Sequence, residues 1–160
     1  MPNNLGFRSG QVVLQKFRVE STSIVEPGDM VYLDETHIRP ASELTWNTDL
    51  ATTQADFANV FVGIAHESST DGEDAPVSID VSSSSVYEFD VANATYDNGN
   101  PLGADGSGSV LLSQQLAYAD PATQAIARAA EFVNQMTTRL RVTFASAYST
   151  GSANSNASIG

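Results

Sequence analysis

Apolar and polar residues alternate most regularly in two stretches, residues 77–81 and 87–91. In the first, Val and Ile alternate with Ser and Asp, and in the second, Tyr, Phe and Val alternate with Glu and Asp. Successive side chains of a strand point to opposite faces of a sheet, so the pattern predicts two strands that each bury one face. Asp80, Glu88 and Asp90 are expected on the faces that water reaches.

Further strands are predicted where β-branched and aromatic residues gather next to turn signals. Lys16 and Arg18 would lie on the exposed face of the first of them. The continuous apolar run VFVGIA has the length of a strand, and its Gly63 predicts a bulge or a close approach of another backbone. Turns are expected at Ser9-Gly10 and Pro27-Gly28. These strands are predicted at residues 11–19, 30–33, 60–65, 110–112 and 139–144.

Two segments have features of a helix. Residues 52–59, TTQADFAN, are predicted to form a brief helix capped by its first threonine. Residues 121–133 allow two interpretations, because their alanines and Pro121 favour a helix, whereas the flanking turns arrive at a spacing typical of strands. The Asp, Asn and Gly content of residues 97–101 and 105–108 is typical of turns.

The composition favours a β-rich fold. Only 16% of the 160 residues are charged, and Ser, Thr, Asn and Gly take much of the remaining share. We therefore expect an all-β protein with one short helix, built as a compact β-barrel or β-sandwich with extended N- and C-terminal segments. The expected organisation is an N-terminal arm at residues 1–9, a β-rich domain at 10–145 and a Ser/Asn/Gly-rich tail at 146–160.

Charge is distributed unevenly along the chain. Nineteen Asp and Glu against seven Lys and Arg give a net charge of −12, and no Lys or Arg occurs between residues 41 and 127. A chain this acidic repels phosphate backbones and anionic lipid surfaces. We therefore expect neither a nucleic acid nor a membrane as partner. Either the acidic surface simply keeps the protein soluble, or the basic terminal segments form one pole that docks on a partner.

Residues that could carry out catalysis are sparse. Cysteine is absent, and His37 and His66 stand in no metal-binding spacing. No serine-hydrolase elbow, phosphate loop or dinucleotide motif occurs, so neither enzymatic activity nor a cofactor is expected. Oxygen ligands for calcium could converge at residues 71–74 or 97–105, but neither segment has EF-hand spacing. The prediction is therefore solvated acidic turns and no metal site.

The order of these elements resembles a known family. The chain contains in succession PGDMVYLD, TTQADFANVFVGIA, APVSIDVSSSSVYEFDVA, NGNPLGADGSG, DPATQAIARAAEFV and TTRLRVTF. This succession resembles the small β-rich capsid decoration proteins of tailed bacteriophages, also called cement or head-stabilising proteins and sometimes labelled as phage recombinase. The resemblance covers roughly residues 10–145. It rests on Gly28 and Asp29 entering a strand, on Gly63 in VFVGIA, on the aromatic strand at 86–89 and on AIARA before the closing strand.

The resemblance implies a protein of the virion, soluble in the host cytoplasm before assembly. It would sit on the outer surface of an icosahedral head as a homotrimer, at three-fold or quasi-three-fold positions, with the major capsid protein and its sister subunits as partners. It also implies that residues 123–132 are extended, so we predict strand there. Shell stabilisation needs interface burial repeated over many copies rather than a reaction. The predicted contact residues are Arg8, Lys16, Arg18, Arg139 and Arg141.

An alternative is another surface module of the virion, such as a spike base, a fibre or a carbohydrate-binding domain. Sugar rings stack on exposed aromatic side chains. Glycan binding is therefore expected to show as a cluster of exposed aromatic residues around Trp46, Tyr87 or Tyr96.

Overall fold

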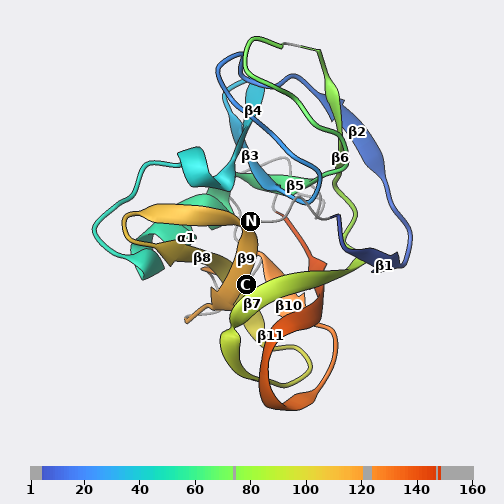
Figure 1. Cartoon of the computed structure of the whole chain (residues 1–160), viewed down its shortest axis with the longest axis vertical. Helices are drawn as coiled ribbons and strands as arrows, with labels where there is room; N and C mark the ends of the chain where they lie inside the picture. The colour runs from blue at the N-terminus through green and yellow to red at the C-terminus, as the bar shows by residue number, and fades with distance from the viewer. Residues whose placement is uncertain (1–4, 74, 121–123, 147, 149–160) are drawn as a thin grey trace.

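The computed structural model describes residues 5–73, 75–120, 124–146 and 148. Within these residues the fold is mainly β, as the sequence predicts, and its strands form two sheets, one above the other in Figure 1. The elements are β1 (Phe7–Ser9), β2 (Leu14–Phe17), β3 (Met30–Asp34), β4 (His37–Pro40), the 3-10 helix η1 (Ala41–Glu43), α1 (Leu50–Val60), β5 (Phe61–Ala65), β6 (Val77–Asp80), β7 (Val86–Tyr96), β8 (Pro101–Ser107), β9 (Val110–Tyr118), β10 (Ala127–Ala129) and β11 (Val133–Phe144).

The lower sheet closes into a five-stranded barrel. Its order is β1-β7-β11-β10-β8-β9, and β9 returns to pair with β7 in parallel at Asp90↔Gln115 and Val91↔Leu116. The neighbouring pairs along the sheet are antiparallel. This ring leaves few unpaired edges, which is the advantage of barrel closure. The β-barrel expected from the sequence is confirmed.

The upper sheet has the order β2-β6-β5-β3-β4 and curls around a core of its own. Its two ends meet just beyond β2, at a bridge between Val19 and Ile38. There the N–H of Ile38 donates to the carbonyl of Arg18 at 2.8 Å, and the N–H of Glu20 donates to the carbonyl of Ile38 at 3.2 Å.

β5 is buried on both faces because it lies between the two cores. Phe61 and Ile64 pack into the core shared with the barrel, whereas Val62 and Ala65 pack into the core of the upper sheet. Both faces therefore require apolar side chains, which explains why VFVGIA shows no alternation. Gly63 of β5 allows the backbone of the neighbouring strand β6 to approach closely.

The predicted close approach and irregularity at Gly63 are both confirmed. A Cβ atom added there would lie 2.1 Å from the carbonyl oxygen of Asp80 on β6. On its other side, the pairing of β5 with β3 shifts register between Val31 and Tyr32. Only glycine lets the β5 and β6 backbones pass this closely.

α1 is confirmed, but the predicted threonine cap is wrong. The helix begins at Leu50, and Asp49 is its N-cap, with extended backbone and a carboxylate that accepts the N–H of Thr52 at 2.8 Å. That hydrogen bond lowers the pKa of Asp49. An aspartate one residue before the helix satisfies the free N–H groups of its first turn, so the helix starts earlier than the threonines suggest.

Within residues 121–133 the structure forms the short strand β10 at Ala127–Ala129 rather than a helix over the segment, whereas Gln124 lies in a 3-10 turn. β10 pairs with β8 on one side and with β11 on the other. Ala127 and Ala129 are buried in the barrel core, and tertiary pairing overrides the helix propensity of alanine there. Residues 121–123 lie outside the described residues.

Several boundaries differ from the prediction. The strand expected at 11–19 is limited to Leu14–Phe17, whereas the one expected at 110–112 continues to Tyr118. β8 runs on through Ser107, so the turn expected at 105–108 falls at Gly108, which has a φ of 63°. Sequence pattern sets the existence of a strand better than its ends.

Candidate functional site

Three of the five predicted contact residues lie together on the outward face of the barrel. Glu88 is at the centre, where its Oε1 lies 3.0 Å from Nη2 of Arg8 and 3.4 Å from Nη2 of Arg139. Arg139 also approaches Asp90, with 3.7 Å between Nη1 and Oδ1. Arg141 stands directly opposite Glu88 in the strand register. We call these five residues, Arg8, Glu88, Asp90, Arg139 and Arg141, the arginine face.

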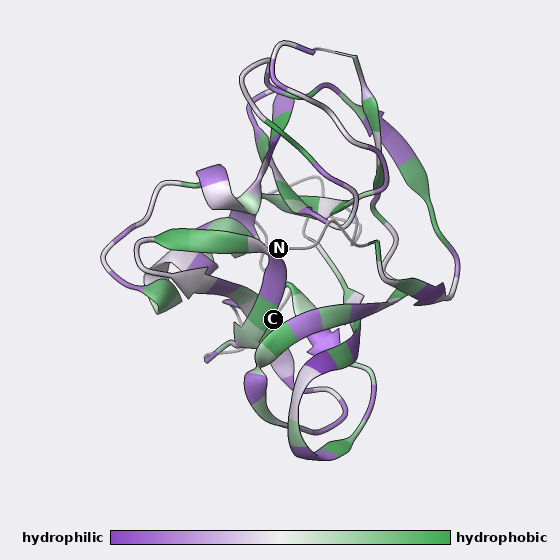
Figure 2. Cartoon of the chain, viewed as in Figure 1, coloured by the Kyte–Doolittle hydropathy of each residue, from purple (hydrophilic) through white to green (hydrophobic). Residues whose placement is uncertain are grey.

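The alternation of β7 and β11 explains why these side chains point outward. Tyr87 and Phe89 on β7, and Leu140 and Val142 on β11, enter the core, so the residues between them face away from it. Alternating bands mark β7 in Figure 2. Because β1 and β11 both pair with β7, residues 7–9 and the residues of β11 lie side by side with β7 on this face although they are far apart in the sequence.

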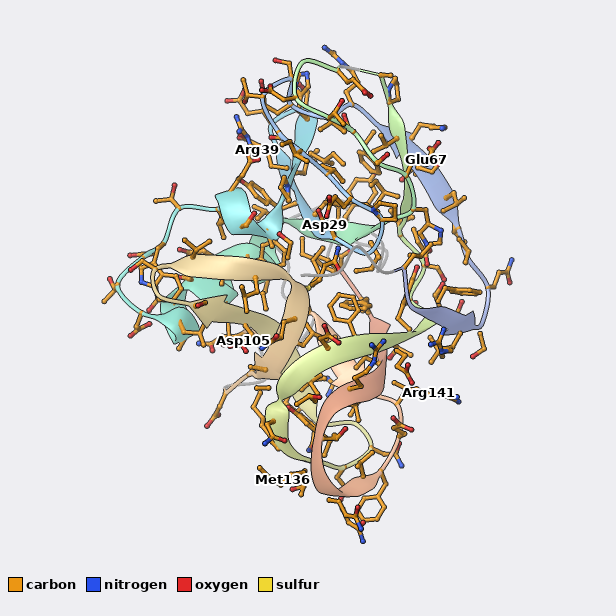
Figure 3. The ribbon with its side chains drawn as sticks, viewed as in Figure 1. Asp29, Arg39, Glu67, Asp105, Met136 and Arg141 are labelled. Atoms are coloured by element: carbon orange, nitrogen blue, oxygen red, sulfur yellow. The ribbon has the colours of Figure 1, made fainter. Side chains whose placement is uncertain are left out.

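Lys16 and Arg18 lie elsewhere, on or beside β2 of the upper sheet. Nζ of Lys16 is 2.8 Å from Oε1 of Glu67. This bond and those from Ser78 lower the pKa of Glu67 to about 2. The side chain of Arg18 is exposed. Figure 3 shows how far apart the two groups lie: Glu67, the partner of Lys16, is near the upper strands, whereas Arg141 is on the barrel. The five basic residues are thus divided between two sheets.

The arginine face combines both signs of charge. Each of the ion pairs of Glu88 is partly exposed to solvent. Exposed pairs of this kind contribute about 0–1 kcal/mol, so a guanidinium can leave its carboxylate at little cost. The planar fork of arginine binds a carboxylate in a defined geometry. Chemically, the face can exchange internal carboxylates for those of a partner.

Asp80 was predicted to be exposed to water, and this prediction is wrong. Its side chain is buried, with 3% exposed for the residue, and its Oδ2 accepts a hydrogen bond from the hydroxyl of Tyr87 at 2.6 Å. Oδ1 accepts the backbone N–H of Val13 at 3.2 Å and that of Ser82 at 2.9 Å. The period-two pattern correctly predicted that Asp80 points away from the core of the upper sheet. The barrel covers the face of β6 to which Asp80 points, so the side chain is nevertheless buried.

His66 completes this buried chain. Its Nε2 lies 2.7 Å from the Tyr87 hydroxyl, and because that hydroxyl donates to Asp80, we assign the ring N–H to Nε2. Phe7 of β1 packs on His66 and on Tyr87. Burial lowers the pKa of His66, and burial together with Asp80 raises that of Tyr87. The arrangement joins the two sheets through hydrogen bonds.

The acidic turns show no gathered metal ligands in the part of the chain that the structure describes. Asp71 and Glu73 are exposed, and Asp74 lies outside the described residues. Asp97 and Asn100 serve a turn, in which the N–H of Asp97 donates to the amide oxygen of Asn100 at 2.6 Å. The other histidine, His37, has its Nδ1 3.0 Å from the hydroxyl of Thr36.

None of the described helices has both the length and the apolar character needed to cross a membrane. No family model matches the chain, and none of the curated proteins matches it.

Proposed function

We propose that this chain is a non-enzymatic capsid decoration protein that binds the outer surface of an icosahedral viral head as a trimer and stabilises the shell. The observation that supports this most is the arginine face. Arg8 of β1 and Arg139 and Arg141 of β11 lie on the two strands that flank β7, on either side of Glu88. Residues so far apart in the sequence form one polar surface on a closed barrel.

In this proposal, carboxylates of the shell or of a sister subunit replace Glu88 and Asp90 as partners of the arginines. Each exchange contributes little by itself, because the ion pairs are exposed. Repetition over the copies of a symmetric particle makes the sum large. The rest of the chain is strongly acidic, with no Lys or Arg between residues 41 and 127, and would keep crowded particles apart.

The proposal is tested on purified heads of the virus that encodes the chain. The protein should sediment with the heads, and electron microscopy should show density on their outer surface with the barrel facing the shell through its arginine face. Light scattering on the free protein would show whether the trimer forms before attachment. Heads that lack the protein, or density inside the shell, would refute the proposal.

A carbohydrate-binding surface module is the second candidate, and a hollow at one end of the barrel favours it. The hollow has a volume of about 230 Å³, and its lining includes the exposed rings of Tyr118 and Phe132 beside Asp97 and Asn100. Tyr118 stacks on the buried Tyr96, with 4.9 Å between ring centroids. Aromatic rings next to amide and carboxylate groups form a surface that suits sugars.

The aromatic residues named from the sequence contribute little exposed surface to such a site. Tyr87 and Tyr96 are buried, and Trp46 is half-buried and packs against the barrel core. A glycan array probed with the wild-type protein and with Phe132→Ser tests the alternative. Binding that the substitution abolishes would support it, and an array without any signal would refute it.

A further inference from the structure

A groove of about 400 Å³ runs between the two sheets, along one side of β9. Aliphatic side chains line much of it, and two of them are well exposed for their type: Ile24 at 56% and Val110 at 46%. Leu112 and Pro40 add to the same apolar lining. Exposed aliphatic groups that line a concave surface are typical of a binding site rather than of ordinary solvent-facing surface.

Two carboxylates belong to the same lining. Asp29 is almost fully buried, with 6% exposed, and Glu26 is half-buried beside it. Figure 3 shows Asp29 at the level where the two sheets face each other. Of the described residues that line the groove, none is Lys, Arg or His. The groove therefore combines aliphatic surface with negative charge that no lining cation neutralises.

Hydrogen bonds hold the walls of the groove at a fixed separation. Nε2 of Gln114 on β9 donates to Oδ1 of Asp29 at 2.8 Å and to the carbonyl of Pro27 at 3.3 Å. The hydroxyl of Ser113 accepts the N–H of Ser42 at 3.0 Å, which ties η1 to β9. A groove that is already formed costs little conformational entropy when a ligand binds.

The environment of Asp29 favours the binding of a positively charged group beside its carboxylate. Burial raises the pKa of Asp29, Glu26 raises it further by like-charge repulsion, and the hydrogen bonds from the Glu26 backbone and from Gln114 only offset part of this. A cation brought close to both carboxylates would relieve the repulsion and stabilise the charged form of Asp29.

We propose that this groove binds an extended segment of a partner protein in which an aliphatic residue stands next to a lysine or arginine. The aliphatic side chain contacts Ile24, Val110 and Leu112, and the cation approaches Glu26 and Asp29. The charge of the groove is opposite to that of the arginines on the outer face, so this site takes a different partner segment. The inference does not depend on the decoration role, and either can fail without the other.

The test uses two acetylated and amidated peptides, Gly-Leu-Arg-Gly and the same sequence with citrulline in place of arginine. Citrulline keeps the shape of arginine and removes its charge. Titration into ¹⁵N-labelled protein should shift the amide signals of Val110, Ser113 and Gln114. The arginine peptide should bind about tenfold more tightly than the citrulline peptide, because its hydrogen bonds to the carboxylates are charge-assisted.

Variants locate the effect. Glu26→Gln and Asp29→Asn should each weaken the arginine peptide several-fold and leave the citrulline peptide unchanged. Asp71→Asn removes the same charge from an exposed turn outside the groove and serves as the matched control. Glu26→Gln keeps the test decisive if Asp29→Asn destabilises the fold. Equal affinity of the two peptides, shifts outside the groove, or no shift at millimolar peptide would overturn the proposal.

Discussion

The hydroxyl of Tyr87 donates a hydrogen bond of 2.6 Å to the carboxylate of Asp80, and this bond joins the barrel to the upper sheet. The two residues are seven positions apart, on consecutive strands that belong to different sheets. The carboxylate of Asp80 accepts hydrogen bonds from the described residues Val13, Ser82 and Tyr87. A buried carboxylate is tolerated only when it is satisfied in this way.

Tyr87→Phe should therefore destabilise the protein. The substitution leaves Oδ2 of Asp80 buried without its donor, and an unsatisfied buried group of this kind costs about 1–3 kcal/mol. Urea unfolding followed by circular dichroism measures the loss. Tyr148→Phe removes a hydroxyl that donates to Gln15 at an exposed position, and this control should change the free energy of unfolding by much less. Equal losses in the two variants would contradict the buried role of Tyr87.

Stability should fall as the pH drops below about 6.5, the ordinary pKa of histidine. Burial lowers the pKa of His66 in the folded protein, so between the folded and the unfolded values the unfolded chain binds more protons. Unfolding is then favoured as the pH falls through this window. Urea unfolding between pH 7.5 and 5 measures the slope. His66→Gln should flatten it relative to wild type, and an unchanged slope in that variant would contradict the role of His66.

Gly63→Ala should be severely destabilising. The added Cβ would meet the carbonyl oxygen of Asp80 at 2.1 Å, and neither backbone can yield without breaking the pairing of β5 with β6. We expect a loss of about 3 kcal/mol or more, measured by urea unfolding or seen as insoluble expression. Gly99→Ala is the comparison, because its added Cβ meets no atom within 4 Å and its cost is confined to its φ of 83°. A fully stable Gly63→Ala protein would contradict the packing of β5.

Replacing Arg8, Arg139 and Arg141 together by glutamine should leave the fold intact and weaken binding to heads. The ion pairs of Arg8 and Arg139 are partly exposed, so the free energy of unfolding should change by about 1 kcal/mol or less for each pair that is lost. Binding should also weaken with added salt, because exposed charges are screened over about 8 Å at physiological ionic strength. Co-sedimentation at several salt concentrations measures both effects.

Arg128→Gln is the control for that experiment, since Arg128 donates to the carbonyl of Gly99 outside the arginine face. It should reduce binding only slightly. If the triple variant occupies heads as well as wild type does, the arginine face is not the contact surface.

Alternation predicted β6 and β7 and the inward positions of β11, because side-chain direction in a strand follows directly from sequence order. The sequence also predicted the apolar strand β5 and the close backbone approach at Gly63. The burial of Asp80 could not be predicted from the sequence, because it depends on a second sheet that covers the outer face of β6. Sequence pattern distinguishes the two faces of a strand but does not show that both are covered.

The arginine face was predicted only in part. Strand alternation places Arg139 and Arg141 on one face, but their meeting with Arg8 depends on β1 and β11 lying on either side of β7. The order in which distant strands pair is not encoded in any local sequence pattern. Lys16 and Arg18, expected with the others, belong to a different sheet for the same reason. The groove beside β9 combines residues from three separate segments, 24–29, 40–42 and 110–114, so no single stretch of the sequence could have indicated it.

The placement of β7 between β1 and β11 also has a consequence for how the protein is made. Pairs such as Phe7↔Tyr87 and Val86↔Thr143 connect residues that leave the ribosome far apart in time. β1 emerges first and has no partner until β7 appears, and β7 in turn waits for β11. Contacts of such long sequence separation slow folding. The barrel therefore assembles late in synthesis or after it, and a nascent chain stalled before Val133 cannot complete it.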